Sequence, residues 1–171
     1  MGARRLAALA LLAGAAAASA QPKSDWEREQ EERNWREAEA ALPAFPQQGN
    51  WGQFYTDAAS GFRFYVDRSS IAVGPDRIVR FTLLALSPLG PMNISFEGLR
   101  CDKREHKIYA IGRADGSWSR REGSWRLGAQ RWQIELRSEF FCPKGYAIAS
   151  PAEGVDALRR GGHPNKEQHI Q

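Results

Sequence analysis

The chain has 171 residues, of which 42% are hydrophobic and 26% are charged, and its formal net charge is +4. This length is enough for one domain with a sizeable buried core. The weak net charge argues against a dedicated nucleic-acid binder, because such proteins concentrate many more cations on one surface.

The first twenty residues have the pattern of a secretory signal peptide. Arg4 and Arg5 precede an uncharged apolar run from 6 to 18, and Ala18-Ser19-Ala20 matches the small-x-small cleavage pattern. We expect cleavage after Ala20, export to the periplasm and no membrane span in the mature chain. Cleavage would remove two of the 24 basic residues and leave 22 against 20 acidic ones.

The next segment, residues 21–46, is predicted to be a charged helix followed by a linker. Ser24 and Glu27 have the spacing of a capping box, which predicts a helix over 24–41. Trp26 and Trp35 are nine positions apart and would point to opposite sides, so no continuous apolar stripe forms. The prolines of LPAFP at 42–46 then prevent the helix from continuing.

The middle of the chain predicts an antiparallel sheet. Strand-like segments occupy 62–67, 78–87, 92–100 and 106–112, and two short ones are expected at 117–120 and 124–127. Turn sequences such as GPDR at 74–77 and PLGP at 88–91 recur about every ten residues, as in a meander.

A register with Thr82 opposite Glu97 would divide the sheet into two faces. The first would be core and carry Val79, Phe81, Leu83, Ala85, Ile94 and Phe96. The other would be mixed, and either half open to water or partly covered by a helix. There Arg80 and Glu97 would be diagonal neighbours, either as an exposed ion pair or as the floor of a polar ligand pocket.

The last third predicts two helices and a tail. Trp132, Leu136 and Phe140 recur every four residues and favour a helix within 129–141, although strand alternation also fits part of it. Ser150 as N-cap and Gly161 as terminator predict a second helix over 151–160. Residues 161–171 lack periodic apolar positions, which predicts a disordered tail. The expected fold is a single α+β domain over 47–160, with an antiparallel β-meander sheet of about six strands and helices packed on one side.

The two cysteines, Cys101 and Cys142, are predicted to form a disulfide, because an even pair in an exported protein usually does. Closing a loop of this length is worth about 4 kcal/mol in the chain-entropy model. No CxxC spacing or histidine pair supports a metal site instead.

Several short motifs together resemble a known family. They are VDRSSIAVG at 66–74, Glu-Gly-x-x-Cys at 97–101, DGSW at 115–118 and Phe-Cys-Pro at 141–143. Over about Trp51 to Pro143 the chain resembles the cryptic neisserial protein-like family of small exported bacterial proteins. That family has no established activity, so the resemblance implies an exported, disulfide-linked single domain and no particular chemistry or cofactor.

Catalytic signatures are sparse. The sequence has no Gly-x-Ser-x-Gly elbow and no His-Glu-x-x-His helix. Two of the three histidines, His163 and His169, lie in the expected tail, which leaves His106 as the one candidate base. Only a fold that brings Asp67 and Glu97 to His106 would favour a small periplasmic hydrolase acting on envelope polymer.

The sequence GSWSRREGSW at 116–125 has two interpretations. A turn at 121–123 would make a hairpin, and inward-facing Trp118 and Trp125 would leave Arg120 and Arg121 as a solvated tip. One outward-facing indole beside the arginines would instead form a stacking platform for a sugar, a nucleobase or a peptidoglycan fragment. We favour the hairpin.

The leading functional hypothesis is therefore an exported, non-enzymatic protein that binds an envelope ligand or protein partner. Its candidate binding residues are Arg80, Glu97, Trp118, Arg120, Arg121 and Trp125.

Overall fold

The computed structural model describes residues 24–46 and 50–166. The chain divides into two compact units, Met1–Trp35 and Arg36–Gln171. In the first unit the described residues form helix α1 (Asp25–Asn34), with the predicted capping box at its start. The Ser24 N–H donates to the Glu27 carboxylate at 2.8 Å, and the Glu27 N–H donates back to Ser24 Oγ at 3.3 Å. The helix ends at Asn34 rather than at Ala41, because the backbone turns extended at Trp35.

The second unit is built on one antiparallel sheet whose first six strands follow each other in chain order. The strands are β1 (Trp51–Thr56), β2 (Arg63–Val73), β3 (Ile78–Leu86), β4 (Met92–Arg100), β5 (Glu105–Gly112), β6 (Trp118–Arg120) and β7 (Arg126–Leu127). The predicted meander is confirmed, although β1 was not among the predicted strands. The remaining elements are α2 (Arg131–Glu135), the π-helix η1 (Leu136–Phe141), the 3-10 helix η2 (Pro143–Gly145) and α3 (Pro151–Arg160).

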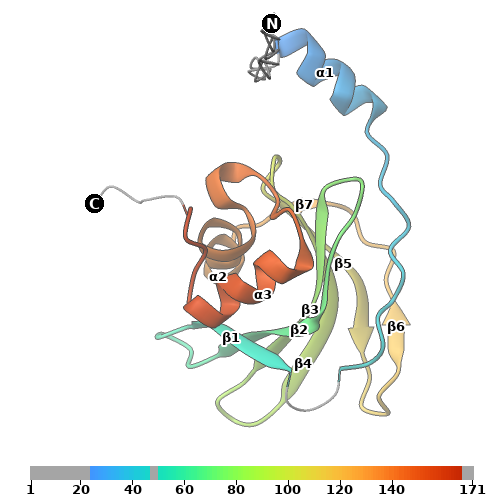
Figure 1. The fold of residues 1–171 in the computed structure, drawn as a ribbon. Coiled ribbons are helices and arrows are strands. Elements are labelled where there is room, and N and C mark those ends of the chain that lie inside the picture. Colours follow the sequence, from blue (N-terminus) through green and yellow to red (C-terminus); the bar gives the residue numbers. More distant parts are fainter. Residues whose placement is uncertain (1–23, 47–49, 167–171) are drawn as a thin grey trace, which may run out of the picture. The chain divides into compact units, whose positions relative to one another are not determined.

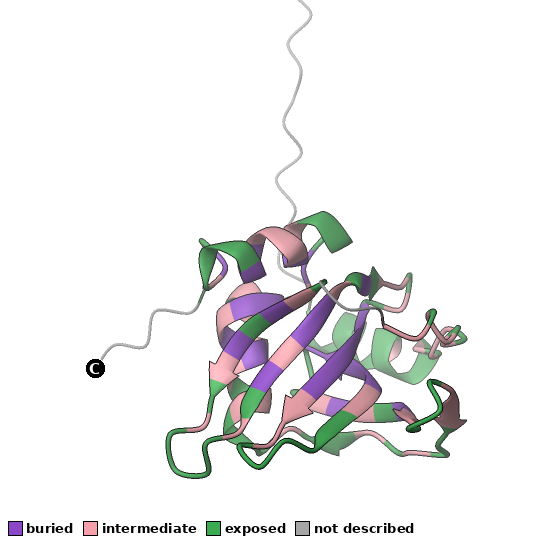
Figure 2. Cartoon of the chain, turned by 90° about the horizontal axis from the view of Figure 1, so that it is seen from below, coloured by how far each residue is buried: buried purple, intermediate pink, exposed green. Residues whose placement is uncertain are grey.

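Helices α2 and α3 lie on one side of the sheet, which confirms the α+β prediction (Figure 1). The face they cover, here the helical face, carries the main core, and buried residues run along the central strands (Figure 2). Phe81 of β3 is fully buried there, and its ring meets Phe141 of η1 edge to face at 5.5 Å. Ile148 and Ala157 close the same core from the C-terminal side.

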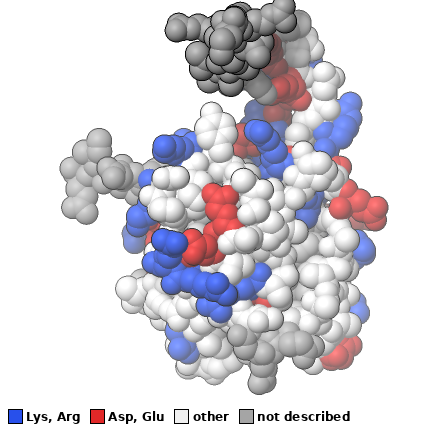
Figure 3. Space-filling model, in the orientation of Figure 1, with Lys and Arg blue, Asp and Glu red and all other residues white. Residues whose placement is uncertain are grey.

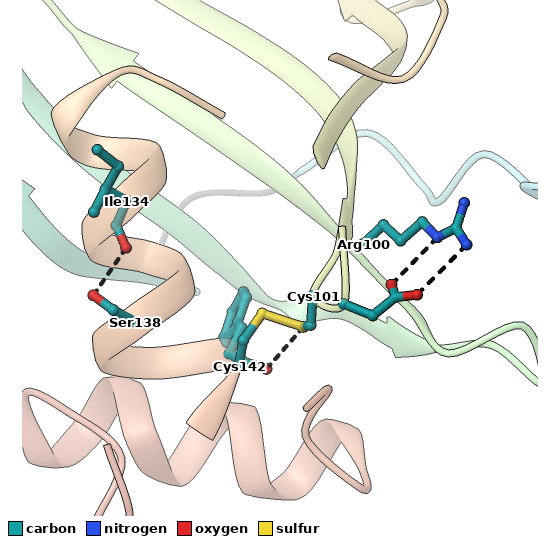
Figure 4. Close-up of a disulfide and its surroundings, with 7 residues drawn as sticks. Arg100, Cys101, Ile134, Ser138 and Cys142 are labelled. Carbon is teal, nitrogen blue, oxygen red and sulfur yellow. Dashed lines mark hydrogen bonds and ion pairs between the residues drawn. A yellow bond between two sulfur atoms is a disulfide. The ribbon is translucent and has the colours of Figure 1, made fainter. Parts of the chain in front are cut away.

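The π-helix explains how two adjacent phenylalanines are both buried. The Cys142 N–H donates to the Arg137 carbonyl at 2.8 Å, five residues back, which widens this last turn. Phe140 and Phe141 are 3% and 0% exposed as a result. The turn delivers Cys142 to Cys101 at the end of β4, with a Cα–Cα distance of 5.6 Å (Figure 4). The predicted disulfide is therefore confirmed, and it ties the sheet to the helical layer.

The predicted register of β3 and β4 is wrong by one residue. Phe81 lies opposite Glu97, and Thr82 lies opposite Phe96. The cause is the connection, because the Ser87 N–H donates to the Pro91 carbonyl, so Pro91 belongs to the ladder rather than to the turn. A shift of one residue moves every side chain of β4 to the other face.

The corrected register separates residues that the sequence had grouped. Ile94 and Phe96 lie opposite Leu84 and Thr82, on the face away from Phe81. Arg80 and Glu97 also lie on opposite faces of the sheet, so they form neither a diagonal ion pair nor a shared pocket floor.

The second face of the sheet is covered by residues 36–46, here called the strap. This segment is extended and packs Ala40 and Leu42 against Phe96, Tyr109 and Ala110. The sheet face beneath it is called the strap face. The predicted helix over 24–41, followed by a linker, is therefore corrected here, because residues 36–46 are extended and belong to the sheet unit.

The C-terminal helix begins and ends as predicted. Ser150 Oγ accepts the Glu153 N–H at 3.3 Å, and Gly161 ends α3 with φ +71°. The chain after it does not match the predicted tail, because His163 is 4% exposed and its Nε2 lies 2.7 Å from Glu153 Oε1. Residues 167–171, with His169, lie outside the described residues.

Candidate functional site

A buried ion pair holds the strap on its face. Arg80 donates to Asp76 at 2.6 Å, and the two side chains are 6% and 1% exposed. Asp76 also accepts the Ala38 N–H at 2.8 Å, while Arg80 donates to the Ala38 carbonyl at 3.0 Å. Burial raises the pKa of Asp76, but the hydrogen bonds from Arg80 and Ala38 outweigh it and hold the pKa below the usual 3.8. Arg80, a predicted binding residue, is thus engaged by the chain itself.

Glu37 makes an ionic contact between the strap and the sheet. Its carboxylate accepts from Lys107 Nζ at 2.8 Å and from Trp125 Nε1 at 3.1 Å. Burial raises the pKa of the Glu37 carboxyl. The hydrogen bonds it accepts, first among them the one from Lys107, lower the pKa by more, so it lies below the usual 4.5. Glu37 is therefore held ionised at neutral pH.

The stretch 116–125 is not a hairpin. Strands β6 and β7 do not pair with each other: β6 pairs with the end of β5, and β7 pairs with its beginning. Residues 118–127 are thus one edge strand, interrupted between its two paired parts. The hairpin prediction is wrong because REG at 121–123 does not reverse the chain, so both short strands pair with β5.

Both indoles of this edge strand contact the strap. Trp118 Nε1 donates to the Pro43 carbonyl at 2.9 Å, and Trp125 donates to Glu37. Each ring is half-buried, so neither forms the exposed stacking platform that the sequence left open. Arg120 and Arg121 are exposed, and the sequence-predicted set is not brought together as one site.

Glu97 and His106 meet on the helical face. His106 Nδ1 lies 3.7 Å from Glu97 Oε2, and both side chains are at most 5% exposed. Ser95 Oγ donates to Glu97 at 2.7 Å, and Trp132 meets the imidazole edge to face. Within the described residues, neither ring nitrogen of His106 has a hydrogen-bond partner.

Asp67 does not join this pair. It lies opposite Thr82, on the strap side of the sheet, and its carboxylate accepts from the Ser69 hydroxyl at 2.7 Å. The three-residue constellation that would favour a hydrolase is therefore not assembled.

An open cavity of about 610 Å³ lies between the β2–β3 turn and the segment that precedes α3. It is lined by Val73, Gly74, Pro75, Arg77, Tyr146, Ala147, Ile148 and Ala149. Ile148 is fully buried and supplies an apolar wall, whereas Tyr146 is 70% exposed. Arg77 is exposed with φ +62°, and no acidic side chain lines the cavity. The cavity therefore offers one cation, one aromatic ring and aliphatic walls.

Sequence reasoning missed this cavity. GPDR was identified correctly as a turn, but its partner segment 146–149 is separated from it by about seventy residues and carries no periodic pattern. The composition of the turn gave no indication of a cavity either, because a single arginine in a turn is common on protein surfaces.

The surface shows no single-sign field on the face seen in Figure 3, where acidic and basic side chains are interspersed. Across residues 24–46 and 50–166, no group of three or more His, Cys, Asp or Glu side chains is placed to hold a metal ion. Among the same described residues, none of the helices combines the length and apolar character needed to cross a bilayer.

The fold defines an α+β protein with one antiparallel sheet covered by helices on one face and by an extended strap on the other. The chain belongs to the CNP1-like family, whose model matches residues 30–159. This match confirms the resemblance and extends it over the strap and α3. No curated protein and no solved structure matches the chain.

Proposed function

We propose that this protein is exported to the bacterial periplasm and binds an anionic envelope ligand in the cavity beside Arg77. The cavity carries the proposal, because its volume of about 610 Å³ falls within the range of about 300–1,000 Å³ typical of small-molecule sites. It is also open to solvent and not filled by the chain itself, unlike the strap face.

The residues of the cavity suggest the chemistry of the ligand. A guanidinium forms paired hydrogen bonds with a carboxylate or phosphate, and Arg77 is the cation available for this. The Tyr146 ring offers a flat surface for a sugar, and Ile148 offers an apolar wall. Peptidoglycan fragments combine carboxylates with sugar rings and small apolar groups, so they fit these features.

Binding is better supported than hydrolysis. The Glu97–His106 pair is closed off from solvent, and Asp67 lies on the opposite face. The cavity residues include no carboxylate, histidine or thiol that would act as a base or nucleophile.

A titration tests the binding site. Muramyl dipeptide, which carries a sugar and one free carboxylate, should bind the full chain in calorimetry, and Arg77→Asn should weaken binding about tenfold or more. Asparagine tolerates positive φ, so this variant removes the charge and keeps the turn. Tyr146→Ala should weaken binding as well, whereas Arg120→Gln removes an exposed arginine elsewhere and should change nothing. Wild-type affinity in Arg77→Asn would disprove the cavity as the site.

Export has a separate test. The pattern in residues 1–20 and the Cys101–Cys142 disulfide both support it. Intact-mass measurement on the periplasmic fraction of an expressing bacterium should give a chain starting at Gln21. A cytoplasmic chain that retains residues 1–20 would refute the proposed location.

A further inference from the structure

The strap face holds the strap by its backbone as well as by its side chains. The buried pair Asp76 and Arg80 binds both the N–H and the C=O of one residue, Ala38. Trp118 binds a second carbonyl, that of Pro43, five residues along the strap. Contacts of this kind fit an extended polypeptide whatever its side chains are, as in other sites that bind peptides through the main chain.

Two further positions select particular side chains. Lys107 and Trp125 together bind the Glu37 carboxylate at the start of the strap. At the other end the Phe45 ring packs on Trp118 with a centroid distance of 5.1 Å. A Cβ on Gly112 would come within 3.0 Å of the same ring, so this glycine leaves room for an aromatic residue. The face thus accepts an acidic residue followed, eight positions later, by an aromatic one.

The strap is attached without joining the sheet. Residues 36–46 form no helix or strand, and within the described residues no backbone–backbone hydrogen bond links them to the sheet. A true strand would be fixed by a ladder of such bonds. The strap is fixed by a few side-chain contacts, as a bound peptide is, and the boundary between the two compact units falls directly before it.

We propose that the strap face is a polypeptide-binding groove, and that the strap of a second copy of this chain binds there in place of the resident one. A second copy supplies the identical acidic residue, backbone groups and phenylalanine, so every contact described above is satisfied again. Exchange of an identical segment between protomers needs no new interface chemistry. The proposal is independent of the ligand in the Arg77 cavity.

A labelled peptide tests the groove on the full chain. Fluorescein-labelled peptide of residues 36–46 should bind in an anisotropy titration, weakly to the wild type, because the resident strap competes. The double variant Glu37→Gln/Phe45→Ala weakens only the resident strap and should raise the apparent affinity about tenfold or more, since more of the groove is vacant.

Variants of the groove itself should weaken peptide binding, whereas the strap variant strengthens it. In the Glu37→Gln/Phe45→Ala background, Asp76→Asn should abolish peptide binding. Trp118→Phe keeps an aromatic ring but removes the indole N–H, and should weaken binding about fivefold; this second variant decides the matter if Asp76→Asn does not fold. A peptide with Ala38→Pro lacks one backbone donor and is the matched control. Equal binding of both peptides, or no gain in the strap variant, would overturn the groove.

The second copy is tested by mixing. Two differently tagged full chains, incubated together at high concentration, should be recovered as mixed dimers. An excess of the 36–46 peptide should dissociate these dimers. Peptide binding without mixed dimers would overturn the assignment of a second copy as the occupant.

Discussion

The two faces of this one sheet are stabilised by different interactions. The helical face is held by interlocking apolar side chains such as Phe81 and Phe141, and by a disulfide. The strap face is held by a buried ion pair and by hydrogen bonds to a segment that has no secondary structure of its own. Removing volume from a densely packed apolar core destabilises the fold at many positions. A buried ion pair and its hydrogen bonds instead depend on a few charged atoms. The strap contacts, which need Asp76 and Glu37 ionised, are therefore expected to respond to acid more than the apolar core around Phe81.

The largest effect is expected on the helical face. Phe81→Ala should lower the free energy of unfolding by about 3–5 kcal/mol, because a fully buried ring leaves a cavity that the neighbours cannot fill. Thr82→Ala is the control on the adjacent position. It should cost far less, since the Thr82 hydroxyl has no hydrogen-bond partner among the described residues. Equal costs in urea denaturation would contradict the assignment of the two faces.

On the strap face, Asp76→Ala should cost about 3–5 kcal/mol, because it leaves the Arg80 guanidinium buried without its partner. The double variant Asp76→Ala/Arg80→Met removes both charges and should recover most of that loss. Acrylamide quenching of Trp118 and Trp125 gives a second readout, since both should become accessible when the strap is released. Arg120→Ala, at an exposed position, should stay within about 0.5 kcal/mol of the wild type. A double variant as unstable as the single one would show that the pair is not what holds the strap.

The disulfide connects the sheet to the layer that covers its helical face. Cys101→Ala or Cys142→Ala should lower stability by about 2–5 kcal/mol, because the unfolded chain regains the freedom of the open loop. Labelling of both thiols by an alkylating reagent in the native, unreduced protein would contradict the bridge and this estimate.

Acid is expected to open the strap before the helical core. Its effect on the free energy of unfolding should be smaller than that of the variants above. The pKa values of Asp76 and Glu37 are lowered in the folded protein, so their contribution is complete above about pH 4.5 and is lost as the pH falls through the lowered values. Amide exchange measured from about pH 7 down to about pH 3 should show the strap opening before the helical core. Glu37→Gln should flatten this dependence, and simultaneous opening of both faces would contradict it.

Much of the fold was predictable because it rests on local signals. Residues close in sequence are enough to predict the caps at Ser24 and Ser150 and the meander. The disulfide follows from the presence of two cysteines. The register of β3 and β4 did not, because it depends on whether Pro91 ends the turn or begins the strand. That one hydrogen bond decides which face each side chain of β4 lies on, and it places Glu97 on the face opposite Arg80.

The candidate sites were harder to predict, since they depend on contacts across the chain. Nothing in REAEAALPAFP indicates that Ala38 will be held by a pair of residues some forty positions away. The family motifs also describe structure more than chemistry. Ser70, within VDRSSIAVG, fills the bulge of β2 by accepting the Thr82 N–H, and Gly98 leaves the space that Tyr109 occupies.

The broken edge strand at 118–127 has one more consequence, for association between molecules. An uninterrupted outer edge would offer a row of free amide and carbonyl groups to any passing strand and so invite aggregation. Here β6 ends at Arg120, one more hydrogen bond joins the Arg121 N–H to the Tyr109 carbonyl of β5, and the paired strand resumes only at Arg126. The Arg121 and Glu122 side chains are exposed in between. Charged side chains and an irregular backbone at the rim discourage a further strand from adding there. The stretch thus resists uncontrolled growth of the sheet in a crowded, concentrated environment.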